Sequence, residues 1–179
     1  MLRSSAAGAL TVSQLGSLAG CIQASPYADA QTRLDLIARL SALTIPSTDT
    51  LGAASQANTA FASQAIEQSL YSLEPRMLTE VGDWLDDVGG RRFLSQTTDK
   101  QTECLIKLDK SAFQDDSLPK KAGERAWSEI KPLIVASYYS SEVGASKELV
   151  YDPVPGKFEN ITLTDDYRAQ SNEGHGEKW

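Results

Sequence analysis

The sequence predicts a mainly α-helical fold: a small helical bundle-like domain with an extended, Pro-containing arm toward its C-terminal end. Apolar residues recur at helical spacing in successive segments between residues 34 and 138, and turn-forming residues separate these segments. Two prolines and a glycine then interrupt residues 150–158. The 179 residues are enough for one domain with a hydrophobic core.

The first two helices are predicted from their apolar spacing. Leu34, Ile37 and Leu40 share one helical face. That helix should end before Pro46, because the residue preceding a proline is driven out of helical backbone space. A second helix is predicted over residues 61–70 by further apolar side chains at helical spacing.

The third helix has both a start and a stop signal. Pro75 suits the first turn of a helix, where its missing N–H costs nothing. Apolar residues from Val81 to Val88 then follow the i, i+3, i+4, i+7 pattern, and Gly89-Gly90 should end the helix.

Two more helices complete the predicted domain. Thr98 and Gln101 have the spacing of a capping box, in which each side chain satisfies a backbone N–H at a helix start. The helix that follows should reach Ala112. The last helix is predicted over residues 127–138, with a bend or break at Pro132.

The chain divides into segments of different character. Residues 25–163 are predicted to form one helical domain, whose extended and ordered arm spans residues 138–158. Two prolines and a glycine exclude a helix over residues 150–158. Residues 164–179 are polar enough to be a tail.

Composition excludes several functions. The net charge of −7 disfavours nucleic acid and anionic membrane surfaces, which select for clustered Lys and Arg. No apolar stretch is long enough to span a bilayer. The single histidine, His175, lies in a Gly-rich segment, and with Cys21 and Cys104 it cannot supply the paired ligands of a zinc site. Gly89-Gly90 fits no phosphate-binding loop. The sequence therefore predicts no catalytic, cofactor-binding or metal-binding residue.

Residues 1–24 are interpreted as an export segment. Leu18-Ala19-Gly20-Cys21 has the form of a bacterial lipoprotein cleavage box, so Cys21 is the candidate lipidation site. The weakly apolar run before it is typical of twin-arginine signals, although the arginine pair is missing. We expect the true start to lie upstream of Met1. The alternative is a short helix with a chance match to the box.

Several polar residues have a functional and a structural interpretation. Glu142 is predicted to bury its carboxylate against backbone N–H groups near Gly144, the alternative being a solvent-facing side chain. Thr48 and Asp49 are predicted to cap a turn or the next helix, with a ligand role as the alternative. Adjacent acids point in different directions and are predicted to be solvated surface: Asp86-Asp87, Asp115-Asp116 and Asp165-Asp166.

Two stretches carry a resemblance to a known family. Residues 45–53, Ile-Pro-Ser-Thr-Asp-Thr-Leu-Gly-Ala, resemble the I-P-x-T-D-T-P-G-A segment of the gluconate 2-dehydrogenase subunit 3 family. Residues 138–145 and 149–156 resemble that family's Y-F-T-S-E-V-G-A…L-x-Y-x-P-V-P-G ending. The sequence departs from the pattern at Leu51, usually Pro, and at Tyr139, often Phe.

The resemblance implies a protein complex. In this family a large flavoprotein of the glucose-methanol-choline (GMC) type holds FAD and oxidises a sugar such as gluconate, glucose or a glycoside, and electrons pass to a cytochrome or similar acceptor. The small subunit binds no cofactor, stabilises the large one and assists its export. The resemblance thus implies a non-catalytic periplasmic subunit, exported by the twin-arginine route.

The arm is the predicted partner-binding site. Tyrosine and phenylalanine are enriched at interface centres, and the arm combines aromatic residues with rigid prolines. The alternative is that the arm packs on its own helices. A free-standing periplasmic lipoprotein with a binding role is the competing function, and an independent hydrolase would need a nucleophile and base that the sequence lacks. The predicted partner-binding residues are Tyr138, Tyr139, Tyr151, Pro153, Pro155 and Phe158.

Overall fold

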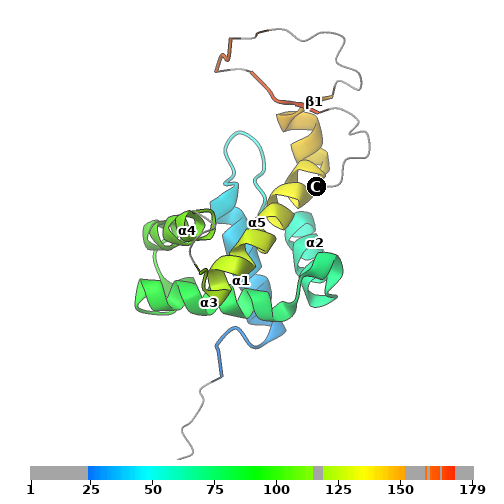
Figure 1. The fold of residues 1–179 in the computed structure, drawn as a ribbon. Coiled ribbons are helices and arrows are strands. Elements are labelled where there is room, and N and C mark those ends of the chain that lie inside the picture. The colour runs from blue at the N-terminus through cyan, green and yellow to red at the C-terminus, as the bar shows by residue number, and fades with distance from the viewer. Residues whose placement is uncertain (1–23, 115–118, 152–159, 161, 166, 172–179) are drawn as a thin grey trace, which may run out of the picture.

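A computed structural model shows the mainly α fold predicted from the sequence (Figure 1). It describes residues 24–114, 119–151, 160, 162–165 and 167–171. The α-helices of these residues are α1 (Ala30–Thr44), α2 (Gln56–Glu67), α3 (Pro75–Gly89), α4 (Thr98–Ala112) and α5 (Ala122–Tyr139). The shorter elements are η1 (Leu70–Ser72), η2 (Phe93–Ser95), η3 (Gly144–Glu148), β1 (Val150–Tyr151) and β2 (Gln170–Ser171).

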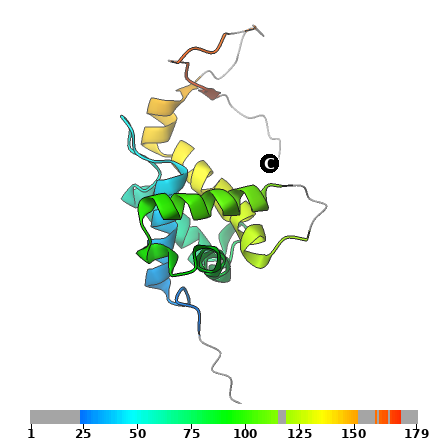
Figure 2. The same cartoon turned by 90° about the vertical axis from the view of Figure 1, so that its left-hand side faces the viewer.

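Helix α5 is the centre of the bundle. It contacts α1, α2, α3 and α4, and its packing against α3 is the most extensive. Figure 1 shows α5 between α4 on one side and α2 on the other, and in Figure 2 α4 crosses in front of the bundle. Trp127, Ile130 and Ile134 of α5 are buried in the core against α1, α3 and α4. This packing leaves another face of α5 to form part of a surface groove.

Local signals explain where the helices begin and end. Asp29 caps α1 by accepting a hydrogen bond from the Thr32 backbone N–H at 2.9 Å. Pro75 occupies the first turn of α3, as predicted. That helix ends at Gly90, whose φ of 69° lies in the left-handed region that glycine adopts without strain.

The predicted capping box of α4 does not form. Its N-cap is Thr97, which makes no side-chain cap. Arg39 of α1 instead donates to the Gln101 Oε1 at 2.6 Å and to the Thr98 Oγ1 at 2.8 Å. Gln101 in turn donates to the Phe93 carbonyl at 2.8 Å. The two side chains connect elements distant in sequence, so they cannot cap their own helix.

Of the bend or break predicted at Pro132, the break is absent, since α5 runs continuously past it. Proline removes one backbone hydrogen bond from a helix interior. Here Ile130 and Ile134, on either side of Pro132, are both fully buried. Their packing holds the two halves of α5 in one helix despite the lost bond.

Residues 25–28 are attached firmly to α3. The Tyr27 ring is fully buried beside Gly82, where an added Cβ would lie 2.4 Å from the ring. The Tyr27 hydroxyl donates to Asp86 at 2.6 Å, and the Asp86 carboxylate also accepts the Phe93 N–H at 2.6 Å. Ser25 donates to Asp83 at 2.6 Å. The prediction that Asp86 is solvated surface was therefore wrong, because its carboxylate joins three segments.

The arm predicted over residues 138–158 is extended only in part. Tyr138 and Tyr139 complete α5, and η3 follows as a π-helical turn. Residues 140–149 contain no proline, so the part of the arm that prolines make rigid begins later than predicted. Among the described residues of the arm the extended part begins at Leu149 and includes β1, which pairs in parallel with β2 from the predicted tail. Cys21, Pro153, Pro155 and Phe158 lie outside the described residues.

The helices of the described residues include none with the length and apolar character needed to cross a membrane.

Candidate functional site

An open apolar groove of about 810 Å³ lies between α2, η1 and the C-terminal half of α5. We call it the α2–α5 groove. It is open to solvent, since Phe61 is 46% and Tyr71 74% exposed along it. Its lining residues are Ala57, Asn58, Phe61, Tyr71, Leu73, Glu129, Pro132, Leu133, Ala136, Ser137, Ser140, Ser141 and Glu142.

One face of α5 forms much of the groove. Its lining residues recur at spacings of three and four, so they share a side of the helix. Leu133 is buried in this face, whereas Pro132 and Ala136 are exposed. The apolar pattern of α5 therefore serves two surfaces, the core and the groove.

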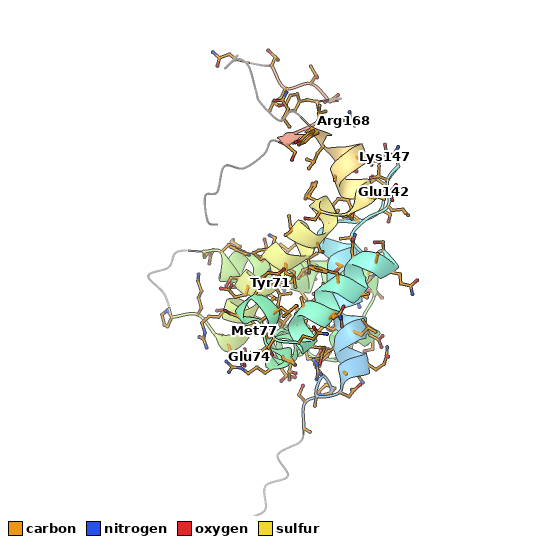
Figure 3. The ribbon with its side chains drawn as sticks, turned by 90° about the vertical axis from the view of Figure 1, so that its right-hand side faces the viewer. Tyr71, Glu74, Met77, Glu142, Lys147 and Arg168 are labelled. Atoms are coloured by element: carbon orange, nitrogen blue, oxygen red, sulfur yellow. The ribbon has the colours of Figure 1, made fainter. Side chains whose placement is uncertain are left out.

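The segment after α2 presents Tyr71 beside the groove in a strained conformation (Figure 3). Ser69, Tyr71 and Ser72 have φ angles of 54°, 55° and 62°, in the left-handed region. This region costs non-glycine residues on the order of 1 kcal/mol each. Buried Leu73 holds the end of the segment against the core. Such strain in a segment with an exposed aromatic is typical of binding surfaces.

The polar groups of the groove are acidic or neutral. Glu129 and Glu142 are exposed, and neither carboxylate has an ion-pair partner within the described part of the chain. No Lys or Arg lines the groove. Asn58 is only 6% exposed, and its side-chain amide bonds no other described residue but still reaches solvent. The groove thus offers apolar contact, one amide, three serines and two negative charges.

The structure separates the predicted partner-binding residues. Tyr138 is 2% exposed and packs in the core, so its assignment to an interface is corrected to a structural role. Burial raises the pKa of Tyr138, and the nearby Glu148 carboxylate raises it further, against a lowering by Thr50. Tyr139 and Tyr151 are 40% and 61% exposed, and neither lines the groove.

Glu142 differs from its prediction, and Thr48 and Asp49 interact within their own turn rather than capping the next helix. Glu142 is exposed rather than buried. The Gly144 N–H instead bonds the Ser141 hydroxyl at 3.2 Å, because Ser141 lies three residues before it in the turn. Thr48 donates to Asp49 at 2.9 Å within its own turn. Ser55, not Thr48 or Asp49, caps α2.

The two motif-bearing segments meet at Glu148. Its carboxylate accepts hydrogen bonds from Thr50 of the 45–53 segment and from the Tyr138 hydroxyl, the latter at 3.3 Å. Gly52 packs against the backbone of residues 45–47, where an added Cβ would lie 2.3 Å from the Ile45 carbonyl oxygen. Sequence reasoning missed Glu148, since nothing in its neighbours marks it as a contact 98 residues away from Thr50.

Sequence reasoning also missed the groove. Asn58 and Tyr71 lie outside both motifs, and their roles depend on how α2 and α5 pack. Phe61 begins the helix predicted over residues 61–70, and the apolar spacing of that segment gave no sign that the ring would face solvent. No group of three or more His, Cys, Asp or Glu that could hold a metal occurs among the residues the structure describes.

The fold and the groove define a small helical domain whose open apolar surface is suited to contact with another polypeptide. The chain belongs to the gluconate 2-dehydrogenase subunit 3 family, whose model matches residues 31–156. The match extends from α1 past β1 and includes the whole groove and both motifs. The family is that of a subunit of a dehydrogenase complex, so this chain is an accessory subunit of such a complex. Comparisons with curated proteins and with solved structures gave no match.

Proposed function

We propose that this chain is the non-catalytic small subunit of a periplasmic FAD-dependent sugar dehydrogenase complex, acting on gluconate, glucose or a glycoside. It stabilises a GMC-type flavoprotein large subunit and assists its export. The observation that carries the proposal is the α2–α5 groove, an open apolar surface within the region that matches the family.

The groove favours a macromolecular partner because its exposed aromatics are arranged for contact. Phe61 and Tyr71 are large side chains with few rotamers, so they lose little conformational freedom when a partner covers them. Aromatic side chains are also enriched among the residues that dominate binding energy. Exposed apolar patches of this kind mark interaction sites in soluble proteins. Covering the groove would thus stabilise both chains.

The chemistry of the complex is assigned to the partner. The large subunit would hold FAD and the sugar, and a cytochrome or similar acceptor would receive the electrons. The proposal also includes residues 1–24. They would direct export by the twin-arginine route, and Cys21 would carry a lipid anchor. Both features would place the assembled complex in the periplasm, held to a membrane by its lipid.

Affinity purification tests the proposed function. We expect the tagged full-length chain, purified gently from its native host, to bring down a large chain in a 1:1 ratio. The complex should absorb near 450 nm and reduce an artificial acceptor in the presence of sugar. The isolated small chain should be colourless and inactive. Purification without a flavoprotein would overturn the proposal in favour of a free-standing lipoprotein, and flavin bound to the small chain alone would overturn its non-catalytic role.

A further inference from the structure

We propose that the α2–α5 groove binds an extended apolar segment of the large subunit that carries lysine or arginine at its ends. The inference rests on the proposed function, and it adds the conformation, charge and length of the bound segment. Three features carry it: the Asn58 amide, the two acidic residues of the lining, and the length of the groove along α5.

The Asn58 amide favours an extended occupant. A side-chain amide offers both a donor and an acceptor, which matches the N–H and C=O of a peptide group. An extended segment has these backbone groups free, whereas a helix uses them internally. Asn58 therefore fits the backbone of an extended chain.

The two carboxylates favour a cationic occupant. Glu129 and Glu142 lie in different turns of the α5 region, and no basic residue of this chain lines the groove to neutralise them. An apolar segment bearing Lys or Arg would pair with these carboxylates while its apolar side chains cover Leu133 and Ala136. An acidic segment would be repelled at both positions.

The spacing sets the length of the occupant. Glu129 and Ser140 lie about 16 Å apart along α5, at 1.5 Å per residue. An extended chain covers that distance with about five residues at 3.3 Å each. Phe61 and Tyr71 flank this path and would contact alternate side chains of the segment. The groove is thus matched to a short extended stretch rather than to a long helix.

Variants of the small subunit in the co-expressed full-length complex test the inference. Asn58→Leu removes the amide but keeps the volume, and Glu129→Lys with Glu142→Lys reverses the charges. Asp87→Lys, on the exposed part of α3 away from the groove, is the charge-reversal control. Tyr71→Asn removes the ring while keeping a residue that tolerates the left-handed region. We expect each groove variant to weaken binding at least tenfold, with Asp87→Lys within twofold of the wild type.

Photo-crosslinking identifies the occupant directly. A benzoylphenylalanine placed at Ala136 in the groove should crosslink to a stretch of the large subunit that is apolar and contains Lys or Arg. The same group at Ile106, exposed on α4, should not give that product. Crosslinks at Ala136 to lipid or to a helical or acidic segment, or groove variants that bind normally, would overturn the inference while the complex itself remains. Failure of the wild-type chain to form any complex would overturn the proposed function as well.

Discussion

Tyr138 and Tyr139 are adjacent and identical in chemistry, yet one belongs to the core and the other to the surface. A helix turns by about 100° per residue, so neighbours face different surroundings. Tyr138 points into the bundle and reaches Glu148, while the Tyr139 ring meets the Tyr138 ring edge-on at 5.1 Å and remains 40% exposed. Asp86 and Asp87 differ in the same way: Asp86 accepts hydrogen bonds from Tyr27 and Phe93, whereas Asp87 is exposed. At this scale, orientation decides what a residue does.

The strain at Tyr71 leads to a stability prediction. Glycine adopts the left-handed region without a penalty, and the exposed Tyr71 ring has little packing to lose. Tyr71→Gly should therefore raise the free energy of unfolding by about 0.5–1 kcal/mol, measured by urea denaturation. Gln68→Gly, at an exposed position with φ of −92°, should not be stabilising. Equal effects at both sites would show that the strain is not stored at Tyr71.

Tyr27 predicts a loss of stability at alkaline pH. Burial, with the Asp86 carboxylate beside the hydroxyl, raises the pKa of Tyr27 far above its usual value of about 10. Above pH 10 the unfolded chain would lose this proton while the folded chain keeps it. The stabilising contribution is therefore complete below pH 10 and falls as pH rises beyond it.

Tyr27→Phe should flatten that alkaline decline, because phenylalanine has no proton to lose. At neutral pH the same change should lower the free energy of unfolding by about 2 kcal/mol, since it removes a hydrogen bond to a carboxylate. Chemical denaturation at a series of pH values from 7 to 11 measures both effects. An unchanged alkaline slope would argue against the assigned role of Tyr27.

At the scale of elements, the 45–53 segment and η3 behave as one unit. Thr50 and Tyr138 share the Glu148 carboxylate, and the Ala53 N–H bonds the Ile45 carbonyl at 2.9 Å. Gly52 allows this close approach of backbone to backbone. These contacts give a structural reason for two distant stretches of sequence to carry the family pattern together.

Gly52→Ala tests the close approach. The added methyl group would overlap the Ile45 carbonyl and the following backbone, so we expect a loss of about 2–3 kcal/mol in the free energy of unfolding. Ala54→Ser, two residues on at an exposed position, is the control and should change it by less than about 0.5 kcal/mol. A near-neutral Gly52→Ala would mean that the segment can move away at little cost.

The helices could be predicted because their signals are local. Apolar spacing and Pro75 indicated the helical segments, and α4 ends at Ala112 as expected. The predictions failed where contacts with residues distant in sequence determine the local structure. Thr98 and Gln101 had the pattern of a capping box, but Arg39 from another helix binds both. Pro132 had the signal of a break, but core packing on either side of it preserves the helix. Neither outcome is visible in the residues nearby.

For the whole molecule, two surfaces near the end of α5 are candidates for the partner. The α2–α5 groove lies along the helix, and the exposed Tyr151 lies beyond its end on β1. Tyr151 and Tyr139 could be chosen from the sequence because they are aromatic residues in or next to a proline-containing segment. The groove combines residues 57–73 with residues 129–142. It could not be predicted from the sequence because it forms only when these two distant segments pack together.

Alanine variants determine the contribution of the arm. If the arm binds the large subunit, Tyr151→Ala and Phe158→Ala should each weaken its recovery, by about thirtyfold for a central aromatic anchor worth roughly 2 kcal/mol. Helical circular dichroism should be largely unchanged, because the Tyr151 ring is 61% exposed. Tyr138→Ala should instead reduce helicity. Unfolding of both arm variants would place the arm in the chain's own core, and normal recovery would leave the groove as the interface.

The seating of Tyr27 has a mechanical consequence. Because the ring is wedged beside Gly82 and its hydroxyl bonds Asp86, a pull on the chain ahead of residue 24 would load α3 through Tyr27 before it could peel α1 away. The ring would act as a stop that transmits tension into the middle of the bundle. Single-molecule pulling from that end should show a lower rupture force for Tyr27→Ala than for the wild type. A domain drawn by its leading end, as a translocation machine draws its cargo, would keep its shape under that load.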